Sequence, residues 1–123
     1  MSTAARSGSP SLEGQGGGSL YQFLLFSGDK LNTLVGLVIN AMQHGMIYVG
    51  LGMLPSANQP EGMQSTAGPG PDALNRVGSF MGPMSASFQI HPPDAPLPGD
   101  LETARLYGAR VAEVTVQLAN GRK

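Results

Sequence analysis

The chain has 123 residues, of which 18 are Gly and 10 are Pro, and only 12% are charged against 41% hydrophobic. This length supports one small domain, and its Gly and Pro residues are concentrated in residues 1–18 and 55–98, so the compact part must be shorter than the chain. A formal net charge of -1 without a Lys/Arg cluster argues against binding to nucleic acid. The absence of Cys excludes disulfides and thiolate sites and fits a reducing compartment, so we expect the cytoplasm.

The first segment, residues 1–18, has the composition of a flexible Gly/Ser-rich tail, and we treat residues 19–123 as the partial domain. The tail lacks the apolar core of a secretory signal. Its GQGGG run lacks the Lys-Ser/Thr of a phosphate loop, so a linker is the better interpretation. Residues 19–26 (SLYQFLLF) follow as a short apolar run that predicts a buried strand, although periodicity leaves the start of a helix open.

An amphipathic helix is predicted next. Ser27 offers a hydroxyl N-cap, and Asp29 would lie in the first turn, where the helix dipole favours a negative charge. Gly45 is placed where a left-handed residue would end the helix. The predicted core-facing stripe has spacings of three and four and comprises Leu31, Leu34, Val35, Val38 and Met42.

Residues 46–51 (MIYVGL) are apolar without polar alternation, which is typical of a parallel strand covered on both faces. A membrane-spanning helix over residues 34–54 is the alternative, because this stretch carries no formal charge. Asn40, Gln43 and His44 near its middle and the helix stop at Gly45 favour a helix that turns into a strand instead. We therefore expect no membrane association.

The segment from residue 54 to residue 98 is interrupted by Pro and Gly. It contains at most a helical turn around residues 71–77 and a short strand within residues 78–90. Connections of this length are often binding loops or oligomer contacts.

A last helix is capped by Asp100 and ends at Asn120-Gly121, with Arg105, Arg110 and Glu113 facing outward. Its predicted core face, with Tyr107 and Val114 beside it, comprises Leu101, Ala104, Gly108, Val111, Thr115 and Leu118. The element order strand, helix, strand, loop, helix predicts an α/β fold with a parallel sheet.

Three separated segments resemble the flavodoxin-like NAD(P)H:quinone oxidoreductases, a group that includes the proteins once named for binding the Trp repressor. They are residues 27–55, Asp72 with residues 74–82, and residues 100–114; His44-Gly45-Met46 before the apolar run is the most specific part. The resemblance implies the C-terminal half of a flavodoxin-like, doubly wound parallel sheet. It also implies FMN as the cofactor, NAD(P)H as co-substrate, a quinone as acceptor and a homo-oligomer.

The resemblance assigns few site residues. His44 matches the family's histidine beside the flavin and the nicotinamide/quinone pocket, which makes it the candidate catalytic and cofactor-binding residue. Ser27 and Gly28 stand where the family's third flavin loop lies, but residues 23–26 replace most of its hydroxyls, and the first two flavin loops have no counterpart. Structural roles are open for both sites: His44 could simply cap helix carbonyls, and Ser27 could be a plain N-cap.

No metal site is predicted, because His91 has no ligand partner at useful spacing. Two functions follow from the sequence. One is an FMN-dependent NAD(P)H:quinone oxidoreductase, truncated relative to its family. The alternative is a non-catalytic, truncated flavodoxin-like module that acts by association with a partner or with its own copies.

Overall fold

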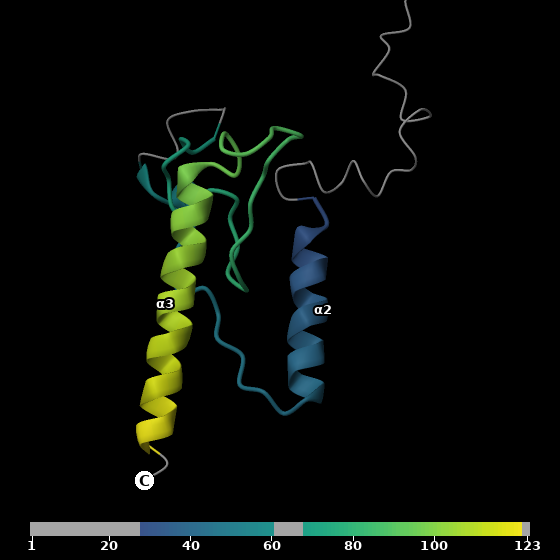
Figure 1. Ribbon diagram of the computed structural model, residues 1–123, viewed down its shortest axis with the longest axis vertical. Coiled ribbons are helices and arrows are strands. Elements are labelled where there is room, and N and C mark those ends of the chain that lie inside the picture. The colour runs from purple at the N-terminus through teal and green to yellow at the C-terminus, as the bar shows by residue number, and fades with distance from the viewer. Residues whose placement is uncertain (1–27, 61–67, 122–123) are drawn as a thin grey trace, which may run out of the picture.

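The computed structural model describes residues 28–60 and 68–121. This part contains helix α2 (Lys30–Gln43), the short 3-10 helix η2 (Ser56–Asn58) and helix α3 (Pro98–Gly121). Figure 1 shows that α2 and α3 begin at the same end of the molecule and run in the same direction, with irregular segments between and beside them.

The predicted flavodoxin-like doubly wound sheet is wrong for the described residues, because neither 28–60 nor 68–121 contains a β-strand. A strand exists only when a neighbour pairs with its backbone. Residues 46–51 lack that neighbour: Leu51 N–H donates to the Phe80 carbonyl at 2.9 Å, whereas the Val49 and Gly50 carbonyls accept from side chains of α3. The other predicted strand of the sheet, residues 19–26, lies outside the described residues.

The strand predicted within residues 78–90 is also absent. Gly78, Phe88 and Gln89 have φ angles of +80°, +46° and +63°, which are incompatible with a continuous extended backbone. The predicted helical turn at residues 71–77 appears only as non-helical turns. Turn and loop conformations therefore replace regular structure throughout this stretch.

The end of α2 confirms the prediction for Gly45, which has a φ of +67°. Gly45 N–H donates to Met42 at 3.0 Å and Met46 N–H donates to Ala41 at 2.9 Å, the two bonds of a Schellman motif. The predicted start is not confirmed, because α2 begins at Lys30 with Asp29 as its N-cap residue and no side-chain cap bond. No helix in the described residues is long and apolar enough to cross a membrane.

Only the middle of the predicted α2 stripe is packed. Val38 is buried and Leu34 and Val35 are half-buried, whereas Leu31 and Met42 are 49% and 63% exposed. The sheet that the stripe was expected to cover is missing from the described residues, so its two ends lack the cover that the sequence predicted.

Helix α3 begins at Pro98 and not after an Asp100 cap. Its buried face is rotated from the prediction: Thr103 is buried and Tyr107 is half-buried, while Leu101 and Leu118 are exposed. The first turns of α3 contact residues 72–76, and Tyr107 and Arg110 further along the helix bind residues 49 and 50. In the described residues, the buried apolar side chains are those of Val38, Leu51, Val77, Ala86 and Ala95.

Candidate functional site

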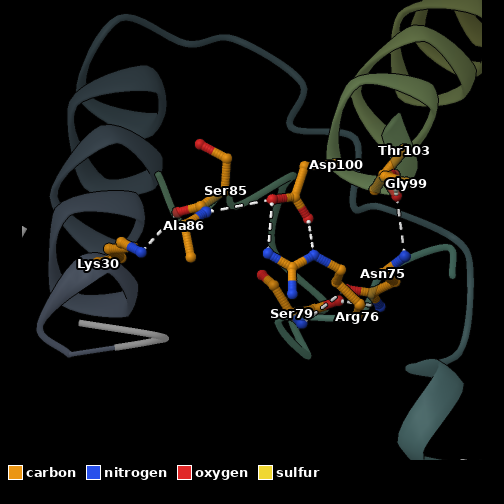
Figure 2. Close-up of polar contacts among 9 residues, drawn as sticks. All are labelled: Lys30, Asn75, Arg76, Ser79, Ser85, Ala86, Gly99, Asp100 and Thr103. Atoms are coloured by element: carbon orange, nitrogen blue, oxygen red, sulfur yellow. Dashed lines mark hydrogen bonds and ion pairs between the residues drawn. The ribbon is translucent and has the colours of Figure 1, made fainter. Parts of the chain in front are cut away.

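An ion pair lies buried at the start of α3 (Figure 2). Arg76 Nε lies 3.0 Å from Asp100 Oδ1, and Arg76 Nη2 donates to Asp100 Oδ2 at 3.2 Å. The two side chains are 3% and 2% exposed. The same Asp100 oxygen accepts from Ala86 N–H at 3.2 Å. One carboxylate therefore joins the first turn of α3 to two loop segments.

Asn75 extends this arrangement with a left-handed φ of +46°. Its backbone N–H donates to Thr103 Oγ1 at 2.8 Å, and the Thr103 hydroxyl donates to the Gly99 carbonyl at 2.6 Å. The Asn75 side chain donates to Ser79 O at 2.7 Å and Met53 O at 3.1 Å, and accepts from Ser79 N–H at 2.9 Å. We call Asn75, Arg76, Ser79, Asp100 and Thr103 the Asp100 cluster. Its partners are within the chain, so its role is structural.

Lys30, the first residue of α2, lies apart from this cluster in Figure 2, with Ser85 and Ala86 between them. Its ammonium donates to the Ser85 carbonyl at 2.5 Å. Partial burial lowers the pKa of Lys30 below its usual 10.5, the nearby Asp100 carboxylate acts in the opposite direction, and Arg76 lowers it further. The sequence did not single out this lysine, because its surroundings come from residues far along the chain.

His44 is the C-cap residue of α2. Its Nδ1 lies 2.8 Å from the Asn40 carbonyl oxygen, which can only accept a hydrogen bond. Nδ1 must therefore carry a proton, and in the neutral imidazole Nε2 is left as an acceptor. This bond confirms that His44 binds a helix carbonyl, the structural role left open by the sequence, and it also fixes which nitrogen can meet a ligand.

An open apolar hollow of about 400 Å³ begins at the residue after His44. It is lined by the segment that follows α2 and by the second half of α3, through Gly45, Met46, Ile47, Val49, Val111, Val114, Thr115, Leu118 and Ala119. The lining is mostly apolar, and His44 precedes its first residue without lining it.

The structure does not bring the predicted site residues together. Gly28 precedes α2 with a φ of +43°, and His44 follows it. The 14 residues of α2 separate them by about 21 Å along the helix axis. Ser27 lies outside the described residues. His91 is exposed, and no group of three or more potential metal ligands occurs in residues 28–60 and 68–121.

Side chains of α3 bind the extended segment that follows His44. Tyr107 donates to the Val49 carbonyl at 2.8 Å and Arg110 Nε donates to the Gly50 carbonyl at 3.1 Å. Arg110 is exposed, as predicted, yet it contributes a tertiary contact. Tyr48 donates to the Met81 carbonyl, and burial, followed by the charge and hydroxyl of Tyr107, raises the pKa of Tyr48 above 10.0.

Comparison with known proteins gives one significant similarity. Residues of this chain are 35% identical over 92 positions to flavodoxin FldP of Pseudomonas aeruginosa. The chain is similar to a flavodoxin. The match covers 75% of this chain but 46% of FldP, so the chain spans about half the length of this relative. No protein-family model and no solved structure matches the chain.

This similarity supports a flavodoxin-like family, the broader part of the resemblance drawn from the sequence. It does not single out the NAD(P)H:quinone oxidoreductases within that family. Sequence analysis did not identify three polar residues of the Asp100 cluster, Asn75, Arg76 and Ser79. The one sign of them in the sequence is that they interrupt a stretch containing the apolar residues Leu74 and Val77.

Proposed function

We propose that this chain is part of an FMN-binding, flavodoxin-like protein. The observation that carries the proposal is the 35% identity to a flavodoxin over 75% of the chain. FMN supplies the redox chemistry when it is bound, and the protein binds and orients it.

The start of α2 has donors that suit the oxygen atoms of a flavin. Asp29 makes no side-chain cap bond there, and Gly28 allows the backbone to turn sharply into the helix. A helix N-terminus without a side-chain cap presents its first N–H groups to an anionic or carbonyl oxygen. These residues fit contacts to FMN, with Ser27 and Gly28 as the ligands that we propose from this chain.

We further propose NAD(P)H as the reductant and a quinone as the acceptor, with His44 at the acceptor site. The proton on Nδ1 leaves Nε2 free to accept a hydrogen bond from a hydroquinone hydroxyl, and the apolar hollow beside His44 would contact the ring face. The length of α2 separates His44 from Gly28. We therefore expect His44 to contact the quinone and not the part of FMN that Gly28 binds.

The first experiment is a titration of the purified full chain with FMN, followed by quenching of flavin fluorescence. We expect saturable binding and a weaker affinity in Gly28→Val, because a β-branched residue disfavours a φ of +43°. Gly108→Ala is the matched control, because a Cβ added at Gly108 meets no atom within 4 Å. A chain that binds no FMN would refute the proposal.

The second experiment measures NAD(P)H oxidation with a quinone in the FMN-loaded chain. We expect His44→Gln to lower kcat, with His91→Gln as the control because His91 is exposed and lies on a different segment. Equal turnover in all three proteins would remove His44 from the reaction.

The association module remains the second candidate, favoured by the exposed apolar side chains of α2 and of the segment after it, among them Leu37, Ile39, Met42, Met46 and Ile47. A homo-oligomer without flavin affinity, found by sedimentation of the purified chain, would support this candidate over the enzyme.

A further inference from the structure

The apolar hollow that begins after His44 has a lining that suits an alkyl chain. Its volume is about 400 Å³, whereas a cavity of about 150 Å³ already holds benzene. Eight of its nine lining residues are Gly, Ala, Val, Leu, Ile or Met, and the ninth is Thr115. The Thr115 hydroxyl donates to the Val111 carbonyl at 2.7 Å. The lining therefore offers a ligand no charged group and no free hydroxyl proton.

The hollow is elongated as well as apolar. On α3 its lining spans residues 111–119, which is about 12 Å along the helix axis. On the other side it follows residues 45–49, which lead from the end of α2 toward the middle of α3 (Figure 1). Met46 and Ile47 are 61% and 62% exposed in the described part of the chain, and Leu118 is 41% exposed. An alkyl chain in the hollow would remove this apolar surface from water, which favours binding.

A guanidinium group lies at one end of this hollow. Val49 is the last lining residue of its segment, and the carbonyl of the next residue, Gly50, accepts from Arg110 Nε at 3.1 Å. A Cβ added at Gly52 would lie 2.5 Å from Arg110 Nε and Cζ, so this glycine lets the guanidinium lie against the backbone. Two contacts therefore fix the guanidinium of Arg110 beside the hollow.

The terminal nitrogens of Arg110 are available to a ligand. Nε is the atom of this guanidinium that binds the chain, and in residues 28–60 and 68–121 no carboxylate pairs with Arg110. A planar guanidinium binds a carboxylate through two parallel N–H···O bonds. The charge of Arg110 therefore favours an anionic head group at the Val49 end of the hollow.

We propose that this hollow binds a carboxylate with a single alkyl chain, such as a fatty acid of medium length. The carboxylate pairs with the Nη1 and Nη2 groups of Arg110, and the chain lies between residues 45–49 and the second half of α3. The quinone ring of the proposed function would occupy the same hollow, so the two ligands exclude each other. Binding of the carboxylate itself needs no flavin, so the inference does not rest on the proposed function.

The test is a calorimetric titration of the purified full chain, without flavin, with decanoate and separately with decanol. Both ligands are kept below the concentrations at which they aggregate. Decanol has the same alkyl chain as decanoate and no charge, so the pair separates the head group from the chain. We expect saturable binding of decanoate, and its absence would overturn the inference.

Arg110→Gln tests the head group. We expect this variant to bind decanoate about tenfold more weakly, because a charge-assisted pair is lost, and to bind decanol as the wild type does. Arg105→Gln removes the same charge from an exposed position of α3 and should leave both affinities unchanged. An unchanged decanoate affinity in Arg110→Gln would overturn the inference. Equal weakening of both ligands would also overturn it, because Arg110 would then only support the segment through Gly50.

Leu118→Gln tests the alkyl chain at a position that is already partly exposed. We expect it to weaken decanoate and decanol alike, by about fivefold, because apolar contact with the chain is lost. Val116→Gln is the control, because Val116 is 58% exposed on the same helix and does not line the hollow. Unchanged affinities in Leu118→Gln would place the chain outside the hollow and overturn the inference.

These titrations and the flavin experiments can fail separately. FMN binding without decanoate binding would uphold the proposed function and overturn this inference. Decanoate binding without FMN binding would do the reverse.

Discussion

At the scale of single residues, the Asp100 carboxylate holds together segments that are distant in sequence. It pairs with Arg76 and accepts from Ala86 N–H while belonging to the first turn of α3 (Figure 2). Removing one partner of a buried ion pair leaves the charge of the other partner desolvated and uncompensated. The loss of stability is therefore larger than the net contribution of the pair.

We therefore expect Asp100→Asn to lower the free energy of unfolding by about 3–5 kcal/mol, measured by urea denaturation. Asp94→Asn is the matched control, because Asp94 is exposed, and it should leave the midpoint unchanged. Equal midpoints for the two variants would contradict a structural role for the Asp100 cluster.

The hydrogen bond from His44 gives a prediction that needs no ligand. In neutral His44 the Nδ1 atom should be protonated, because it faces the Asn40 carbonyl at 2.8 Å. Nitrogen-15 NMR of the side chains, recorded where the imidazoles are neutral, distinguishes the tautomers, with the exposed His91 as an internal reference. A His44 spectrum with the proton mainly on Nε2 would show that this bond does not form in solution.

Tyr48 predicts a pH dependence of stability. Burial first, and then Tyr107, raise the pKa of Tyr48 in the folded chain above 10.0. The unfolded chain therefore loses this proton at lower pH, so the free energy of unfolding falls as pH rises above about 10 toward the folded pKa. Tyr48→Phe should show a smaller fall over the same range, measured as the difference in urea midpoint from the wild type; an identical slope would refute the assignment.

The Asp100 cluster also shows what the sequence could not predict at this scale. An Asp near the start of a helix is a good N-cap, so Asp100 was interpreted as one. Its partner Arg76 is 24 positions away, and no local pattern specifies that distance. His44 was singled out by its resemblance to a family histidine, and its alternative role as a cap of helix carbonyls could be stated from sequence because the bond to Asn40 is local to one helix.

At the scale of elements, local signals were sufficient for the existence of two helices and for the end of α2, but not for the helix starts, for the buried face of α3 or for the strands. The end of α2 at Gly45 depends on a left-handed residue and on bonds within five positions, so the sequence predicted it correctly. The extended residues 46–51 were predicted as a strand because they are apolar, but a strand also needs a pairing partner. In the described residues, α3 side chains bind two of their carbonyls instead.

The contact between α3 and residues 72–73 depends on Gly99. A Cβ at this position would lie 2.3 Å from the Ala73 carbonyl oxygen and 2.8 Å from the Asp72 carbonyl carbon, both backbone atoms. We expect Gly99→Ala to destabilise the fold by about 1–3 kcal/mol through this overlap.

Gly108→Ala is the matched control in the same helix, because nothing lies within 4 Å of its added Cβ. Ala is favoured over Gly in helices, so this variant should gain about 0.5–1 kcal/mol. Thermal unfolding of both proteins measures the difference, and a loss of stability in both would show that α3 does not pack as described.

At the scale of the whole molecule, the described part has a small core and many exposed apolar side chains. A chain with this surface is expected to associate.

We expect the purified chain to self-associate with increasing concentration in analytical ultracentrifugation. The double variant Ile39→Glu/Met42→Glu should associate less, because both side chains are more than half exposed on α2. Asn32→Glu places one negative charge, half of what the double variant adds, at an exposed polar position of that helix and should behave as the wild type. A monomeric wild type at all concentrations would exclude α2 as an association surface.

The hold that α3 exerts on residues 49 and 50 has a consequence for evolution. Tyr107 and Arg110 donate to main-chain oxygen atoms, which every amino acid possesses. The side chain at position 49 can therefore change without loss of either hydrogen bond. Replacement of Tyr107 or Arg110 instead removes one of the two bonds. Variation among relatives should accordingly be tolerated at position 49 and restricted at Tyr107 and Arg110.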